Sequence, residues 1–154
     1  MRLGAEAHRA VQAIIPRIRQ WAAAWGVPAV GLWCILAANA WAESQFNPRA
    51  AGDGGWSIGL WQCNRRAGLG KPYSVAQLQD PVFNLDVVAN EAQRLGLPAK
   101  LRAGMSISDA AAWFCANVER PSDIPGQSRI RAGHADAFAR QLGHTGQTPV
   151  RAAA

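Results

Sequence analysis

A long stretch without charged side chains constrains the fold of this chain more than any other feature. Residues 21–42 contain no Asp, Glu, Lys or Arg, and a stretch of this length could span a membrane. Gly26 and Pro28 interrupt it, however, and proline is well placed in the first turn of a new helix. We therefore predict that one helix ends near Trp25 and that a second helix covers 28–44. Because a helix that is apolar on all sides is buried, the second helix should form the centre of a protein core.

The rest of the chain indicates further helices and one short β-region. Asp80-Pro81 combines a helix-capping residue with a proline in the first turn, and Ser106 is placed to cap another helix. Residues 47–62 are rich in glycine, which favours turns and a short β-hairpin. The expected helices are 5–25 with a break or kink at Pro16, 28–44, 81–95, 107–118, which Pro121 and Pro125 end, and 128–142. The sequence therefore predicts a mainly α (α+β) protein, in which helices pack around one buried helix and a small β-hairpin follows it.

Length and charge limit the possible partners. A chain of 154 residues suits one domain, which we place at 1–142, and residues 143–154 should form a flexible tail. The net charge of +6 attracts polyanions, but no RNP motif, zinc finger or basic heptad region indicates nucleic acid. The anionic polymers of a bacterial envelope fit better, unless the charge serves solubility alone. We expect a monomer.

The helix expected over 5–25 leaves two interpretations open. Its apolar residues recur at helical spacing, with arginines between them. Such a helix can dock on the core, which we favour, or it can bind an anionic membrane surface transiently as a basic amphipathic helix. The N-terminus reaches a charged residue before any apolar segment, so we expect no signal peptide and synthesis in the cytoplasm.

The cysteines and histidines argue against redox and metal chemistry. Three cysteines do not suit a disulfide framework, and Cys34 and Cys115 lie in apolar surroundings, where cysteine behaves as a small hydrophobe. The cysteine spacings match no zinc pattern, and the histidines form no His-Glu-x-x-His motif. We expect no metal ion and no organic cofactor.

Two carboxylates that are close in sequence have opposite surroundings. Glu43 directly follows the apolar stretch, where a carboxyl group is costly to ionise, whereas Asp53 lies in a glycine-rich turn that water should reach. Glycoside hydrolysis uses such a pair: one acid protonates the glycosidic oxygen, and one carboxylate assists water or stabilises the oxocarbenium-like charge. The alternative is that Glu43 caps a helix end or pairs with Arg49, and that Asp53 is an ordinary turn residue.

The segment around these two carboxylates resembles a known family. Residues 43–62 read ESQFNPRAAGDGGWSIGLWQ, a pattern similar to phage tail lysozymes and phage endolysins of the lysozyme superfamily, and partly shared with soluble lytic transglycosylases and goose-type lysozymes. Residues 113–121, WFCANVERP, are similar to the segment that closes the cleft in these relatives. The resemblance implies a lysozyme-like α+β fold and a muramidase that cleaves the β-1,4 bond between MurNAc and GlcNAc in bacterial peptidoglycan.

The resemblance also assigns roles to single residues. It implies that Glu43 is the general acid and that the amide of Gln62 binds a sugar N-acetyl group in the cleft. Tryptophan rings can stack on sugars, and Glu119 is a further carboxylate that could face the cleft or an arginine. The candidate residues are Glu43 and Asp53 for catalysis, and Ser57, Gln62, Trp56, Trp61 and Asn117 for substrate binding.

Several functions remain open at this stage. The leading expectation is a phage endolysin, made in the host cytoplasm and acting on the cell wall in the periplasm, or a virion component with the same activity. A lytic transglycosylase would share Glu43 but would release 1,6-anhydro-MurNAc products without water and without a second acid. A cell-wall-binding or virion module without turnover, or a membrane-permeabilising role for 5–25, are further alternatives.

Overall fold

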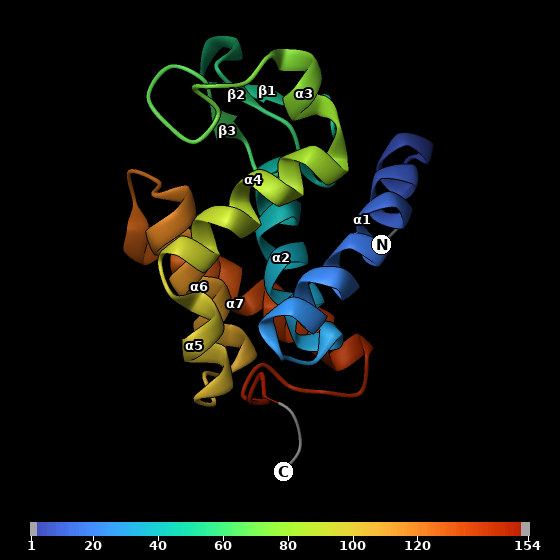
Figure 1. The fold of residues 1–154 in the computed structure, drawn as a ribbon, viewed down its shortest axis with the longest axis vertical. Helices are drawn as coiled ribbons and strands as arrows, with labels where there is room; N and C mark the ends of the chain where they lie inside the picture. The colour runs from blue at the N-terminus through green and yellow to red at the C-terminus, as the bar shows by residue number, and fades with distance from the viewer. Residues whose placement is uncertain (1–2, 152–154) are drawn as a thin grey trace.

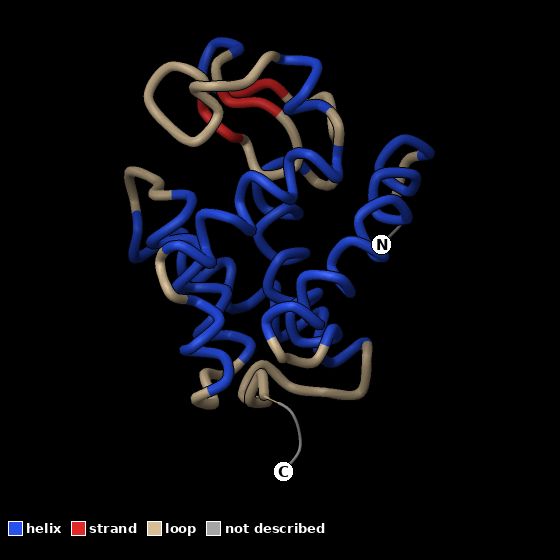
Figure 2. The backbone as a smooth tube through the Cα atoms, viewed as in Figure 1, coloured by secondary structure: helices blue, strands red, loops and turns tan. Residues whose placement is uncertain are grey.

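The computed structural model describes residues 3–151, which form a mainly helical fold with one small antiparallel sheet (Figures 1 and 2). The helices are α1 (Ala5–Trp25), α2 (Ala29–Ser44), α3 (Val75–Gln79), α4 (Pro81–Arg94), α5 (Leu97–Arg102), α6 (Ile107–Phe114) and α7 (Ile124–Gln141). The strands are β1 (Ala51–Gly52), β2 (Ser57–Ile58) and β3 (Cys63–Asn64), and two short helical turns are η1 (Asp53–Gly55) and η2 (Cys115–Glu119). The expected mainly α (α+β) class is confirmed.

Helix α2 is the buried centre of the molecule. It packs against α1, α6 and α7, and all of its residues 34–40 are buried. Within that range the polar side chain is Asn39, whose Nδ2 donates to the carbonyl of Ile35 at 2.8 Å and to that of Ala111 in α6 at 3.4 Å. The strands lie at the end of the molecule where α2 finishes (Figure 1). The last turn of α2, which carries Glu43, therefore meets the β-region from a rigid, buried support.

Helix α1 docks its apolar side on the core. It runs through Pro16 as one continuous helix and packs against α2 and α4. Its buried residues are Ala10, Val11, Ile14, Ile18, Ala22 and Trp25. The opposite side exposes Arg9 and Arg19, so that contact of this helix with a membrane stays a prediction. Across residues 3–151, no helix is both long and apolar enough to cross a membrane.

The β-region after α2 is a short antiparallel meander, and we call residues 47–64 the β-loop. Gly59 has a φ of 87°, and a Cβ atom there would lie 2.2 Å from the carbonyl oxygen of Leu78, so only glycine fits. The buried side chain of Asn84 in α4 accepts a hydrogen bond from the backbone N–H of Trp61 at 2.9 Å. The β-loop is therefore anchored to α3 and α4 and held opposite the end of α2.

The boundary of the last helix differs from the sequence prediction. Helix α7 begins at Ile124 instead of 128. The side chain of Asp123 caps it by accepting from the backbone N–H of Gly126 at 3.1 Å, and Pro125 stands in the first turn, where no N–H is needed. The prediction that Pro125 ends a helix is therefore wrong, since it helps to start one. The short helices α3 and α5 were also not predicted.

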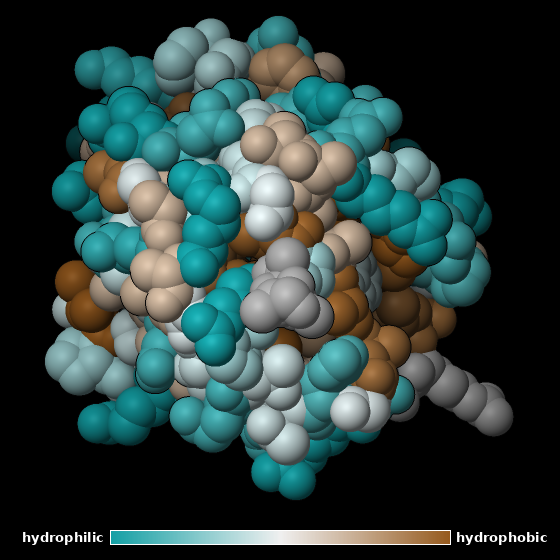
Figure 3. All heavy atoms as spheres, turned by 60° about the horizontal axis from the view of Figure 1, so that its bottom comes forward, coloured by the Kyte–Doolittle hydropathy of each residue, from teal (hydrophilic) through white to brown (hydrophobic). Residues whose placement is uncertain are grey.

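The C-terminal segment packs on the domain. Val150 is 1% exposed and lies against Gly31 of α2, which leaves room for it by having no side chain. The backbone N–H of Val150 donates to the carbonyl of Met105 at 2.9 Å. Residues 143–151 thus contact the domain through the buried Gly146 and Val150, whereas the expected flexibility of 143–154 stays a prediction, and residues 152–154 lie outside the described residues. Toward this end of the molecule, hydrophilic and hydrophobic residues are interspersed over the surface (Figure 3).

Candidate active site

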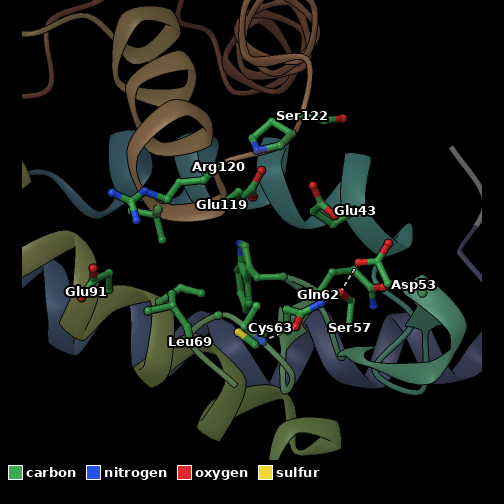
Figure 4. A pocket seen from close by; sticks show the side chains of 18 residues that line it. Glu43, Asp53, Ser57, Gln62, Cys63, Leu69, Glu91, Glu119, Arg120 and Ser122 are labelled. Atoms are coloured by element: carbon green, nitrogen blue, oxygen red, sulfur yellow. Dashed lines mark hydrogen bonds between the residues drawn. The ribbon is translucent and has the colours of Figure 1, made fainter. Parts of the chain in front are cut away.

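A cavity of about 730 Å³ lies where the end of α2, the β-loop, α4 and residues 118–122 meet (Figure 4). Glu43 and Asp53 lie toward one end of this cavity, and Glu91 and Arg120 lie toward the other (Figure 4). Five of the seven predicted site residues line it, namely Glu43, Asp53, Ser57, Trp61 and Gln62. The fold therefore brings most of the sequence-predicted site together at one concave place.

Glu43 reaches the cavity from the last turn of α2, beside a buried arginine. Its side chain is 22% exposed, and its Oε1 forms an ion pair with Nη2 of Arg131 from α7. From the sequence, we expected an apolar wall around Glu43 or, as the alternative, a pairing of Glu43 with Arg49. Arg49 instead pairs with Glu6 at 2.8 Å. Glu43 is therefore held by a guanidinium group that lies 88 residues further along the chain.

The same arginine also binds a second carboxyl group. Nη2 of Arg131 lies 3.2 Å from Oε2 of Glu119, and the two side chains are 3% and 4% exposed. Sequence reasoning missed Arg131, although its position carries a signal. It is four and seven residues before Ala135 and Phe138, which are buried in α7, so it falls on the stripe that faces the core. An arginine on such a stripe indicates a buried acidic partner.

A local widening of the helix after α6 brings Glu119 to this position. The sequence predicts a helix over 107–118, but α6 ends at Phe114 and the chain continues as the π-helical turn η2. The backbone N–H of Arg120, whose φ is 56°, donates to the carbonyl of Cys115 at 2.8 Å. Such wide turns are rare and occur often at functional sites. This turn directs Glu119 toward α7 and the cavity.

The surroundings of Glu119 raise the pKa of its carboxyl group. Burial raises the pKa of Glu119 to about 8, the negative charge of Glu43 adds to this shift, and the charge of Arg131 opposes it. Among residues 3–151, its Oε1 atom is buried without a hydrogen-bond partner. A buried oxygen of this kind disfavours the charged form of a carboxyl group. These surroundings therefore favour the protonated form of Glu119.

This raised pKa predicts a specific dependence of stability on pH. Between the unfolded value of 4.5 and the folded value of about 8, the native state binds one proton more than the unfolded state. The free energy of unfolding should therefore fall as pH rises through this range, by at most about 1.4 kcal/mol per pH unit. Urea unfolding of the Glu119→Gln variant should lack this slope, whereas the matched Glu6→Gln variant should keep it. Parallel pH curves for wild type and Glu119→Gln would contradict the assignment.

Asp53 lies at the exposed rim of the cavity, at the start of η1, with a φ of 51°. The Ser57 hydroxyl donates to Oδ2 of Asp53, and Nδ2 of Asn64 donates to the Ser57 oxygen at 3.1 Å. This series of hydrogen bonds fixes the orientation of the Asp53 carboxylate. The arrangement suits a group that holds a water molecule or a positive charge near Glu43.

Gln62 lines the cavity, but its amide nitrogen serves the β-loop. Nε2 donates to the carbonyls of Ala50 at 3.1 Å and Gly59 at 2.9 Å. A Cβ atom at Gly52 would lie 2.6 Å from Oε1 of Gln62, so the close approach requires glycine there. The Oε1 atom is therefore the part of this amide that can accept a hydrogen bond from a ligand.

The remaining candidates for substrate binding separate into a lining residue and two residues elsewhere. Trp61 lines the cavity but is only 2% exposed. Its Nε1 donates to the carbonyl of Leu36 at 3.1 Å, so its ring packs beneath the cavity and offers little surface for stacking on a sugar. Trp56 is 44% exposed and does not line the cavity. Asn117 donates to the carbonyl of Trp113 at 2.8 Å within its own helix and does not line the cavity either.

The cysteines are buried side chains with raised pKa values. The three cysteines are buried and free, and burial raises the pKa of Cys63 to about 12 and those of Cys34 and Cys115 to about 11, which leaves them as inert thiols. Over residues 3–151, no group of three or more His, Cys, Asp or Glu side chains is placed to hold a metal ion.

Comparisons of the chain with protein-family models, curated proteins and solved structures gave no match.

Proposed function

We propose that the chain is a peptidoglycan-cleaving glycoside hydrolase of the muramidase type. Glu43 would donate a proton to the oxygen of the β-1,4 bond between MurNAc and GlcNAc, and Asp53 would hold the attacking water. We further propose that it serves as a phage endolysin, made in the host cytoplasm and acting on the cell wall, or as a virion component with the same activity. Its resemblance to phage lysozymes over residues 43–62 motivates this choice.

One observation carries the proposal: Glu43 and Asp53 line the same cavity from two different structural elements. Glu43 comes from the rigid end of α2, and Asp53 comes from the exposed β-loop. Two carboxyl groups in unlike surroundings, facing the same space, supply the acid and the assisting carboxylate that hydrolysis of a glycosidic bond needs. Asp53 is exposed at the rim of this cavity, so a glycan can approach the two carboxyl groups from solvent.

The test of this proposal is release of soluble material from purified cell walls. The chain should lower the turbidity of a peptidoglycan suspension. The soluble fragments should end in MurNAc with a free reducing end, not in 1,6-anhydro-MurNAc. Firm binding to the walls without any soluble fragment would favour the alternative of a cell-wall-binding or virion module without turnover.

The closest alternative activity is a lytic transglycosylase, and Asp53 distinguishes the two. In that reaction the substrate's own hydroxyl attacks, the product is 1,6-anhydro-MurNAc, and no second acid takes part. We expect hydrolysis, so Asp53→Asn should lower turnover by about 10²-fold because the water is no longer held by a carboxylate. Mass spectrometry separates the products by one water molecule per cut.

A matched control makes this result specific. Asp109→Asn removes an exposed carboxylate in the first turn of α6, outside the cavity, and should leave turnover unchanged. Full activity of Asp53→Asn together with anhydro products would replace the hydrolase proposal by the transglycosylase.

A further inference from the structure

We propose that Glu119 stores the proton that Glu43 delivers to the substrate, so that the two carboxyl groups and Arg131 act as one acid unit. This inference rests on the proposed function of the cavity and adds to it the source of the proton. Glu43 forms an ion pair with Nη2 of Arg131, and an acid that protonates the substrate in every cycle must be resupplied with a proton each time. The geometry points to Glu119 as the neighbour that resupplies this proton, because both carboxyl groups contact the same nitrogen of Arg131.

The contacts of Glu119 support this assignment. Its Oε2 shares the Nη2 atom of Arg131 with Glu43, which brings the two carboxyl groups together on one guanidinium. Its Oε1 is buried, has no partner among the described residues, and belongs to a side chain that lines the cavity. Burial and the negative charge of Glu43 both favour the protonated form of Glu119 and raise its pKa. A proton on Glu119 can thus pass to Glu43 without crossing solvent.

The charges around Glu119 require one proton in the unit. The groups that face it are Glu43 from α2, Arg131 from α7, and the thiols of Cys63 from β3 and Cys115 from η2 itself. The thiols are neutral because burial raises their pKa values. From α4, which also packs on η2, Val88 and Glu91 line the same cavity. Two carboxyl groups against one guanidinium leave one negative charge in a buried place, and a single proton removes it.

The reaction step balances in protons and bonds. Glu119 gives its proton to Glu43, and Glu43 gives a proton to the glycosidic oxygen as the bond from C1 to that oxygen breaks. Water held at Asp53 then forms the new bond to C1, and its proton leaves through Asp53 to solvent. Glu119, left as a buried carboxylate beside Glu43, regains a proton from solvent before the next cycle. The net change is one water added to one glycosidic bond.

The experiment follows the carboxyl groups and the activity separately. Side-chain carboxyl carbon resonances of the wild-type chain, assigned through the backbone by NMR, should show Glu119 titrating above about pH 7. The Glu119→Gln variant should cleave cell walls near pH 5 almost as well as wild type, but should lose about 10²-fold near pH 8, because its Glu43 must take a proton directly from solvent. Glu6→Gln, which removes an exposed carboxylate from a surface ion pair, is the matched control and should keep the wild-type pH profile.

Each other outcome overturns the inference. Titration of the Glu119 resonance below about pH 6 would show that it stores no proton, and this measurement needs only the wild-type chain, so it holds even if the variant does not fold. An equal loss of activity in Glu119→Gln at every pH would show a structural role. A wild-type chain in which Glu119 titrates as expected but no wall is cleaved would contradict the proposed function, and with it the delivery step, while leaving the buried acid itself in place.

Discussion

Replacing Glu43 by glutamine should lower the rate of cell-wall clearing by about 10²–10⁴-fold, the usual contribution of a general acid. Glutamine keeps the shape of the side chain, and its amide oxygen can still accept from Nη2 of Arg131, so the fold should remain intact. The loss would therefore report the missing proton transfer. The measurement is the rate of turbidity loss of purified peptidoglycan.

The matched control for this variant is Glu6→Gln, the same chemical change at a surface carboxylate that pairs with Arg49 outside the cavity. Its clearing rate should equal that of wild type. If Glu43→Gln clears walls as fast as Glu6→Gln, Glu43 is not the acid, and its ion pair with Arg131 is only structural.

Replacing Arg131 by methionine should lower the free energy of unfolding by about 3–5 kcal/mol, the usual cost of breaking a buried ion pair by removing one partner. Arg131 is 3% exposed and holds Glu43 and Glu119 at the same nitrogen. Without it, two carboxyl groups face each other with no positive charge between them. The cost should be smaller at acid pH, where Glu119 is protonated because burial raises its pKa. Urea unfolding at pH 5 and pH 8 measures both effects.

Arg129 offers a control two residues away on the same helix. It is exposed, and Arg129→Met removes the same charge and adds the same side chain, so its effect should stay within about 0.5 kcal/mol. Equal unfolding midpoints for the two variants at pH 8 would contradict the view that Arg131 neutralises a buried pair of carboxyl groups.

The main helices followed from local patterns in the sequence. The charge-free residues 21–42 predicted two elements and a buried central helix, and the structure confirms both because the interruption at Gly26 and Pro28 is a strong local signal. The capping residue and proline at Asp80-Pro81 likewise begin α4 as expected. The role of Pro125 was predicted wrongly because proline is common both just after the end of a helix and in the first turn of the next one.

The candidate site was predictable only where its residues are close in sequence. Glu43, Asp53, Ser57 and Gln62 fall within one short segment, and the structure places all four at the cavity. Arg131, in contrast, contacts Glu43 across 88 positions of the chain. Its place on the buried stripe of α7 indicates an acidic partner but does not say which acid that is. The sequence patterns also did not predict the π-turn η2, which packs against α4 and α7 and directs Glu119 inward.

Counting new sugar ends released from purified peptidoglycan, with wild type and Glu43→Gln side by side, tests the central claim most directly. We expect the wild-type protein to release MurNAc reducing ends steadily and the Glu43→Gln variant to release almost none, while both proteins remain folded. Release of peptide fragments without new sugar ends, or no release by folded wild-type chain, would contradict the assignment of this cavity to glycosidic cleavage.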